Sequence, residues 1–254
     1  MPIRFGSRRK LRDWRDFARE IVIIVVGVLI ALGASHVAEQ WNWQRRVDVA
    51  EQLLAFESAQ NFSYAVEAVA VGPCIQRQLE VLRTRIVGSA DTLVPAPIHP
   101  GGFSDFVFRA PSRPMGTTIW RALSADGTVP HLEYGRQYRY ALIDNQLAMA
   151  GALSAETDRF VGRLQVLATP IALDASTRAR LLEYIDEQAH RSRLHSLVAL
   201  QVMGSIRDLG NAPSNEADLR AIMEESGTAT LCREQGWPLA DWKSDLAALP
   251  VGTF

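Results

Sequence analysis

The sequence predicts an all-α protein in which an N-terminal transmembrane helix continues into an extracytoplasmic antiparallel helical bundle. Three observations predict this fold class. Residues 21–34 form a run of fourteen residues without a polar side chain. After this run, apolar residues recur mainly at intervals of three and four, which is the spacing of one face of an α-helix. No segment alternates apolar and polar residues for long enough to predict a β-strand.

The apolar run is long enough to span a bilayer once its flanks are included. A helix over residues 17–38 is about 33 Å long, which matches the ~30 Å of hydrocarbon in a typical bilayer. We therefore assign residues 19–38 to the transmembrane helix. Trp14 lies before the span, and Trp41 and Trp43 follow it. We expect these three side chains to anchor the helix at the two membrane interfaces, where indole rings prefer to lie.

The distribution of charge predicts the orientation. The whole chain has 27 basic and 28 acidic side chains, but residues 1–20 hold seven basic and three acidic ones. Basic residues next to a span stay in the cytoplasm, so residues 1–18 are predicted to be a cytoplasmic tail and residues 39–254 an extracytoplasmic domain. The net charge of −1 offers no broad positive surface and argues against a nucleic-acid partner.

Two alternatives for the apolar run remain open. Gly33, Ala34 and Ser35 place small residues at positions −3 and −1 of a possible signal-peptide cleavage site after Ser35. Three acidic residues in the leading segment, and a helical pattern that continues past this site, argue against cleavage. The run is also short enough to be the core helix of a soluble protein.

Small residues repeat within the predicted span. Gly27, Ala31 and Ser35 are four residues apart, so they share one helix face on which a second span can approach closely. The predicted partners of the span are therefore the lipid bilayer and a second copy of the chain. Small residues are also common in membrane helices that do not associate.

Residues 20–32, followed by Glu39-Gln40-Trp41, resemble the opening of a family of bacterial single-pass membrane-anchored proteins of unknown function. Its members begin with a basic tail, a Glu, an aliphatic-Gly-aliphatic-Leu-Ile-Ala-Leu span and then a Trp. Residues 119–127 and 142–145 are similar to that family's Trp and small-residue turn between helices. Members usually have Asn-Asn-Trp after the span, where this chain has residues 36–41. The resemblance implies a bacterial inner-membrane location with a periplasmic helical domain, and it implies no activity.

The remainder of the chain reads as helices joined by turns. Residues 88–116 hold five of the twelve prolines and are predicted to be an irregular connection that is either functional or mobile. A short helix is expected to begin at Thr117 or Thr118 with a hydroxyl cap, and Asp174 or Ser176 is expected to cap a later one. Gly210 is expected to end that later helix in a left-handed conformation. The predicted helices are 42–71, 74–87, 118–126, 131–168, 175–209, 215–226 and 238–249.

The two cysteines, Cys74 and Cys232, both lie in the predicted extracytoplasmic domain. An oxidising compartment favours a disulfide between them, and closing so long a loop stabilises a fold by about 4–5 kcal/mol in the chain-entropy model. The alternative is two buried free thiols, which are common as small core residues.

A search for catalytic chemistry finds no phosphate-binding loop, dinucleotide fingerprint, serine-hydrolase elbow or His-Glu-x-x-His pair. We therefore expect no enzyme, no cofactor and no metal. Glu183, Glu187 and His190 share a helix face, but a di-iron bundle requires Glu-x-x-His on two helices. We interpret these residues, with Arg191 and Arg193, as an exposed salt-linked surface.

One further cluster has two interpretations. Tyr134, Tyr138 and Tyr140 alternate with Arg136 and Arg139. These side chains are expected to pack the rings inward and leave the arginines in water, and the alternative is that they line a ligand pocket.

Two functions follow from this organisation. The first is a non-enzymatic anchored domain that binds an envelope protein or supports envelope assembly. The alternative is a periplasmic ligand-sensing domain, which would act through an accessory signalling partner because the predicted cytoplasmic tail is too short for an output module. A hydrolase would need a catalytic motif that the sequence lacks.

Overall fold

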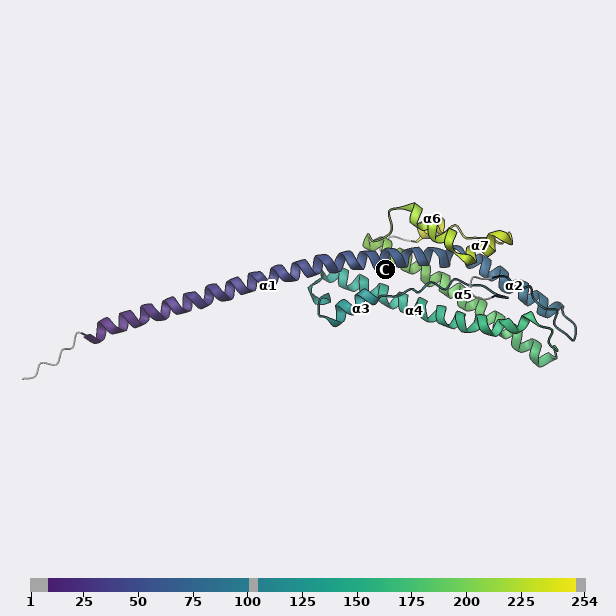
Figure 1. The fold of residues 1–254 in the computed structure, drawn as a ribbon, viewed down its shortest axis with the longest axis horizontal. Helices are drawn as coiled ribbons and strands as arrows, with labels where there is room; N and C mark the ends of the chain where they lie inside the picture. Colours follow the sequence, from purple (N-terminus) through teal and green to yellow (C-terminus); the bar gives the residue numbers. More distant parts are fainter. Residues whose placement is uncertain (1–8, 101–104, 250–254) are drawn as a thin grey trace, which may run out of the picture. The chain divides into compact units, whose positions relative to one another are not determined.

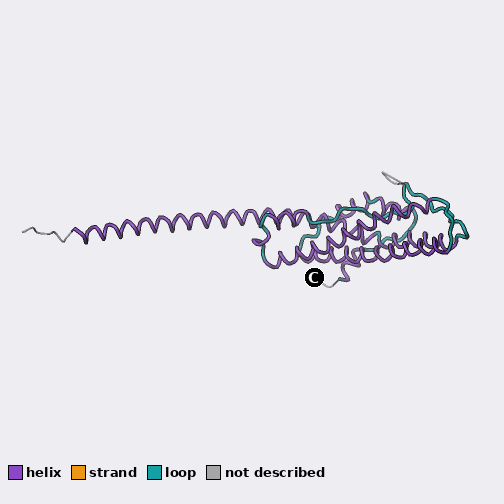
Figure 2. Tube along the Cα trace, turned by 90° about the horizontal axis from the view of Figure 1, so that it is seen from below, coloured by secondary structure: helices purple, strands orange, loops and turns teal. Residues whose placement is uncertain are grey.

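The computed structural model of the chain describes residues 9–100 and 105–249. Residues 1–8 of the predicted basic tail lie outside the described part. Within that part the regular structure is entirely helical, with eight α-helices, two short 3-10 helices and no strand (Figure 2). The predicted all-α fold class is confirmed.

The chain divides into two compact units, the first ending at Ala50 and the second beginning at Glu51. Helix α1, Arg9–Ala70, contributes to both units (Figure 1). All described residues of the first unit belong to this helix. Its C-terminal end agrees with the predicted helix end at residue 71.

The end of α1 follows from a proline and a close packing contact. Helix α2, Gly72–Gly88, begins directly afterwards with Pro73 in its first turn, where a missing N–H costs no hydrogen bond. The carbonyl of Ala70 accepts a hydrogen bond from the N–H of Ala240 at 2.8 Å. A Cβ on Gly72 would lie 2.7 Å from the Oγ of Ser196, so the chain passes Ser196 closely here and a larger residue would require that hydroxyl to move.

Two long helices, α4 (Tyr134–Leu164) and α5 (Ala175–Leu209), lie side by side in the second unit (Figure 1). Gln188 of α5 donates to the hydroxyl of Thr157 at 3.0 Å, and Arg139 near the start of α4 donates to the carbonyl of Asp208 near the end of α5 at 2.6 Å. As residue numbers rise along α4, the numbers of the residues that they contact on α5 fall. The two helices are antiparallel, as short connections between bundle helices require.

Helix α2 packs on α5 in the same antiparallel sense. Gln76 at the start of α2 donates to the carbonyl of Ala189 at 3.0 Å, and Arg178 at the start of α5 donates to the carbonyl of Ile86 at the end of α2. Helix α5 therefore lies between α2 and α4 as the central helix of a three-helix bundle.

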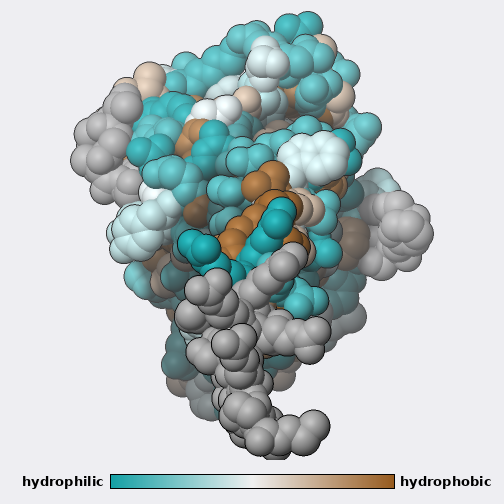
Figure 3. Space-filling model, turned by 90° about the vertical axis from the view of Figure 1, so that its left-hand side faces the viewer, coloured by the Kyte–Doolittle hydropathy of each residue, from teal (hydrophilic) through white to brown (hydrophobic). Residues whose placement is uncertain are grey.

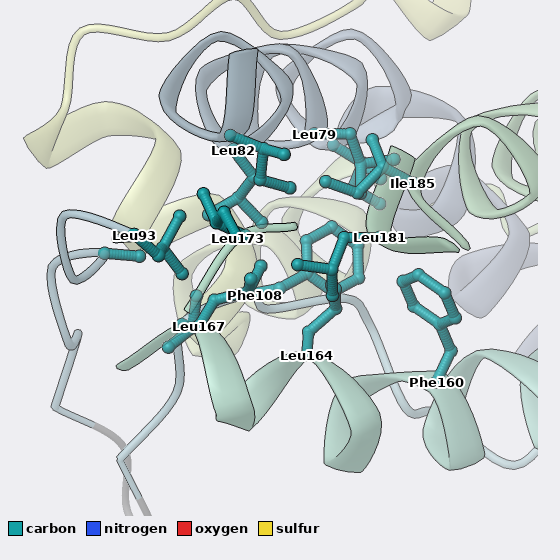
Figure 4. Packing of buried hydrophobic residues seen from close by; sticks show 14 of the residues in the cluster. Leu79, Leu82, Leu93, Phe108, Phe160, Leu164, Leu167, Leu173, Leu181 and Ile185 are labelled. Atoms are coloured by element: carbon teal, nitrogen blue, oxygen red, sulfur yellow. The ribbon is translucent and has the colours of Figure 1, made fainter. Parts of the chain in front are cut away.

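The apolar faces of these three helices meet in one core cluster (Figure 4). Helix α2 supplies Leu79 and Leu82, and α4 supplies Phe160 and Leu164, whose side chains point toward one another with those of α5. Phe108 from the connection after α2 lies among them and meets the ring of Phe160 edge-on, with the ring centres 6.5 Å apart. The other labelled members of this cluster are Leu93, Leu167, Leu173, Leu181 and Ile185.

Several predicted helix ends are confirmed, and one cap is corrected. Asp174 caps α5 by accepting from the N–H of Thr177 at 2.6 Å, and Gly210 ends α5 with φ +82°. The expected hydroxyl cap of helix α3, Thr118–Ala125, is wrong. The hydroxyl of Thr117 instead donates a hydrogen bond to the carboxylate of Asp144. The carboxylate of Glu57 on α1 accepts a hydrogen bond from the N–H of Ile119 at 2.9 Å. A carboxylate from another helix therefore stabilises the positive end of α3.

Three helix boundaries differ from the prediction. Helix α4 begins at Tyr134 because residues 129–131 form a 3-10 turn around Pro130, and it ends at Leu164 with four further 3-10 residues. The short helices α6 (Glu216–Glu225) and α8 (Trp242–Ala248) were expected, but α8 begins four residues after the predicted start at residue 238. Helix α7, Gly227–Glu234, was not expected, because a glycine at its first position weakens the helical pattern.

The structure joins Cys74 and Cys232 in a disulfide, with their Cα atoms 5.9 Å apart and both residues fully buried. This separation is ordinary for a disulfide. Cys74 lies in the first turn of α2 and Cys232 in α7, so the bond attaches the C-terminal segment to the bundle across 158 residues of sequence.

We expect reduction of this bond to destabilise the full chain by about 2–5 kcal/mol, because a long loop in the unfolded state is released. Urea unfolding with and without reductant measures the difference. The control is the double variant Cys74→Ser with Cys232→Ser, whose unfolding midpoint should not respond to reductant. Equal midpoints for the oxidised and reduced wild type would contradict the expectation.

Candidate functional site

A cleft with a volume of about 720 Å³ lies in the second unit. This volume is within the range of small-molecule sites. Its walls come from α1, α4, the connection before α3 and the start of α7. The lining residues are Glu67, Phe106, Phe108, Arg109, Ala110, Pro111, Ser112, Arg113, Pro114, Asp158, Val161, Glu225, Ser226, Gly227 and Thr228.

Two amide side chains fix the backbone of one wall. Gln78 of α2 donates to the carbonyl of Arg109 and accepts its N–H, both at 2.9 Å. Asn61 of α1 does the same with Gly116, at 2.8 and 3.1 Å. The segment between these two contacts, residues 109–116, is called the clamped loop here. The proline-rich connection is thus held by paired hydrogen bonds at the point where it borders the cleft.

The floor of the cleft contains a buried carboxylate. Glu67 is 3% exposed, accepts a hydrogen bond from Ser226 at 2.5 Å and pairs with the Nε of Arg113 at 3.0 Å. Ser226 is also the N-cap of α7 and accepts the N–H of Ala229 at 3.0 Å. A buried charge persists in a fold when it has such partners. Glu67 therefore connects α1, the clamped loop and α7.

The side chains of Arg109 and Arg113 differ in their partners. Arg113 is close to two carboxylates, Glu67 at 3.0 Å and Glu225 at 3.8 Å. Arg109 lies against the start of α7, where a Cβ on Gly227 would overlap its guanidinium group. Within the described residues, Arg109 has no ion-pair partner, and its nearest ring is that of Phe106 at 5.7 Å.

Asp158 of α4 lines another wall of the cleft. It too has no ion-pair partner in the part of the chain that the structure describes, and partial burial raises the pKa of its carboxyl group. The cleft therefore presents one unpaired cation and one unpaired carboxylate beside a neutralised Arg113.

The chain has no significant match among protein-family models, curated proteins or solved structures. The resemblance of residues 20–41 to a membrane-anchored family therefore stays a prediction.

The predicted span residues lie on the exposed surface of α1. Cβ atoms at Gly27 and Gly33 would meet no other atom within 4 Å, and Ala31 and Ser35 are exposed on the same helix. The face that could receive a second helix is therefore open in the single chain.

The predicted interface anchors make local contacts along α1. Trp14 is exposed and lies 6.2 Å from Phe17 between ring centres. Arg45 stacks over Trp41 at 3.8 Å, and Arg46 lies over the ring of Trp43 at 5.0 Å. These contacts place a cation beside both tryptophans of α1 that follow the predicted span.

The tyrosine cluster differs from the expectation. Tyr140 is buried, stacks on Trp120 and accepts a hydrogen bond from Asn211 at 2.8 Å. The rings of Tyr134 and Tyr138 are 82% and 62% exposed, so inward packing of all three is wrong. A helix turns by 100° per residue, so Tyr134 and Tyr138 cannot share the inward face with Tyr140.

The Glu and His face on α5 forms the expected surface ion pair between Arg191 and Glu187. Within the described residues, no group of three His, Cys, Asp or Glu side chains is arranged to hold a metal.

The residues of the cleft were missed in the sequence. Glu67 did carry a signal, because it is a lone charge within the apolar run of residues 65–71. A lone charge in a buried helix segment needs a partner, but the sequence does not say which one. Arg109, Arg113 and Asp158 look like ordinary surface charges.

A second, much smaller cavity of about 10 Å³ lies between α4 and α5. It is about the size of one water molecule. Buried Oε1 of Gln188 and Nε2 of His195 have no hydrogen-bond partner among the described residues, and both residues line this cavity. Burial lowers the pKa of His195.

Replacement of Glu67 by Ala should lower the free energy of unfolding by about 2–4 kcal/mol, because Arg113 and Ser226 lose a buried partner. Glu225→Ala is the matched control: its carboxylate approaches the same arginine but is 68% exposed, and its loss should cost under about 0.5 kcal/mol. Urea unfolding of both variants tests the difference. Equal effects would contradict the structural role of Glu67.

The low pKa of His195 predicts a pH dependence of stability. At a pH above the ordinary imidazole pKa of 6.5, His195 is neutral in both the folded and the unfolded chain, so it does not affect the free energy of unfolding. As the pH falls below that value, the unfolded chain binds a proton that the folded one refuses, so stability declines until the pH reaches the lowered folded pKa.

Urea unfolding between about pH 8 and pH 5 should show this decline in the wild type and a smaller one in His195→Gln. His190→Gln replaces an exposed histidine on the same helix and should leave the slope unchanged. A wild-type slope retained in His195→Gln would contradict the assignment.

Proposed function

We propose that the protein is a single-pass inner-membrane protein whose second unit is a periplasmic, non-enzymatic module that binds an envelope partner or supports envelope assembly. The observation that carries this proposal is the apolar part of α1. An 18-residue window of the helix has a mean hydropathy of 2.6, and none of the window is buried. A core helix of a soluble protein would bury this surface, because exposing it to water is costly.

Two features support the proposed orientation. The excess of basic residues precedes the apolar segment, and such residues stay in the cytoplasm. The disulfide between Cys74 and Cys232 lies in the second unit, and disulfides persist in oxidising compartments such as the periplasm.

The proposed position of the second unit in water is supported by its surface. On the face of the molecule drawn in Figure 3, hydrophilic side chains prevail, as expected for a domain in water. Self-association through Gly27, Ala31 and Ser35 would bring two such modules together, since small residues allow membrane helices to approach closely.

A second candidate function is ligand sensing through an accessory signalling partner. The observation that favours it is the 720 Å³ cleft with its mixture of apolar walls and unpaired charges. Such a mixture is typical of sites for small molecules.

The membrane proposal predicts that the full chain, expressed in a bacterium, stays in the membrane fraction after a high-salt wash. A phosphatase reporter fused after residue 254 should be active, because the C-terminus is outside. Intact mass should include residues 1–35, whereas a cleaved signal peptide would remove them.

Ile24→Asp with Val28→Asp should release the chain from the membrane, since each carboxylate at the centre of a span costs about 2.5–3.5 kcal/mol. The matched control is Val49→Asp with Leu53→Asp, which changes two exposed apolar residues of the same helix outside the span. A salt-washed soluble wild type, or a C-terminal fluorescent protein that matures in the cytoplasm, would contradict the proposal.

A further inference from the structure

Some charged side chains of the cleft have ion-pair partners within the protein and others have none among the described residues. Glu67 and Glu225 neutralise Arg113, so this arginine has little attraction left for a ligand. Arg109 and Asp158 line the same cleft, and neither has an ion-pair partner among the described residues. Arg109 and Asp158 do not form an ion pair with each other either, because no nitrogen of the guanidinium group lies within 4 Å of the carboxylate oxygens.

The surroundings of Arg109 suit a carboxylate. Its guanidinium group lies against Gly227, the first residue of α7, whose N–H has no acceptor within the helix. Thr228 is 3% exposed and lines the cleft, and the described chain provides its hydroxyl with no hydrogen-bond partner. A guanidinium group, a hydroxyl and free N–H groups at a helix start are donors that a carboxylate accepts.

Asp158 offers the complementary group. Its carboxylate is reachable from the cleft, and no described cation neutralises it. An ammonium group donates three hydrogen bonds and pairs well with such a carboxylate. The same cleft also has apolar lining residues, which include Phe106, Ala110 and Val161.

We propose that the cleft binds a short peptide with free ends, whose carboxylate lies on Arg109 and whose ammonium group lies on Asp158. A zwitterion satisfies both unpaired groups at once, whereas a simple anion or a simple cation leaves one of them unpaired. The apolar wall accepts side chains between the ends. A peptide suits this cleft better than a free amino acid because the cleft volume of about 720 Å³ is within the range that holds a drug-sized ligand.

This inference rests on the ligand-sensing candidate and not on the membrane span. Binding is measured on the full chain in detergent, so the result is independent of where the chain resides in the cell. Failure of peptide binding leaves the membrane test unaffected, and failure of the membrane test leaves the binding data unaffected.

The probes are trialanine, N-acetyl-trialanine and trialanine amide, measured by isothermal titration. Acetylation removes the ammonium group and amidation removes the carboxylate, and all three peptides have the same side chains. We expect saturable binding of trialanine and a loss of about tenfold for each capped peptide, as is usual for one charge-assisted contact.

Two variants assign the ends of the peptide. Arg109→Gln should weaken trialanine about tenfold and abolish its advantage over trialanine amide, while its advantage over the acetylated peptide remains. Asp158→Asn should show the opposite pattern. This cross-pattern is not expected from a general loss of structure, which would weaken all three peptides alike.

Matched controls remove the same charges elsewhere. Arg163→Gln changes an arginine of α4 that lies over the ring of Tyr184, and Asp186→Asn changes a carboxylate that pairs with Arg83. Both should bind trialanine as the wild type does. The inference is overturned if trialanine shows no saturable binding at millimolar concentration, if capping has no effect, or if the controls lose as much affinity as the cleft variants.

Discussion

The buried carboxylate of Glu67 is the constraint on which the arrangement of the second unit depends. Removing a charge from water costs several kcal/mol unless partners replace the lost hydration. Its partners, Arg113 and Ser226, come from segments 46 and 159 residues away. The clamped loop and the start of α7 must therefore converge on one point of α1, and the cleft is the space that this convergence leaves.

Hydrogen bonds and the disulfide also hold the clamped loop and α7 in place. Gln78 and Asn61 hold the backbone of the clamped loop, and the disulfide holds α7 to the first turn of α2. A loop fixed at both ends presents its side chains at defined positions, which a binding site requires. The proline-rich connection thus forms a wall of the cleft.

The charged side chains of the cleft are of two kinds: those that pair within the fold and those that have no ion-pair partner among the described residues. Arg113 pairs with Glu67 inside the fold. Arg109 and Asp158 have no ion-pair partner among the described residues, so their charges face solvent in the cleft. A ligand gains most from groups that the protein leaves without partners, since it breaks no internal ion pair to reach them. The apolar surface of α1 in the first unit likewise has no cover within the described structure.

The local elements of this protein follow from its sequence. The apolar run, the proline break after α1, the Asp174 cap and the Gly210 stop are all local patterns, and they determined the all-α class and most helix ends. The hydroxyl cap of α3 failed because Thr117 found a partner on α4, and α7 was missed because its first residue is glycine. The first error came from a contact between distant segments, and the second came from a local residue that weakens the helical pattern.

The tertiary structure alone decided the cleft. Arg109, Arg113 and Asp158 are indistinguishable from surface charges in the sequence, because periodicity records which face of a helix is apolar but not which distant charge lies opposite. Pairing depends on distances of a few ångströms, and these are fixed only when the helices pack. By itself the sequence determined the helices and the apolar segment. Packing decided which charges pair within the fold and which have no partner among the described residues, because pairing needs the short distances that only packed helices provide.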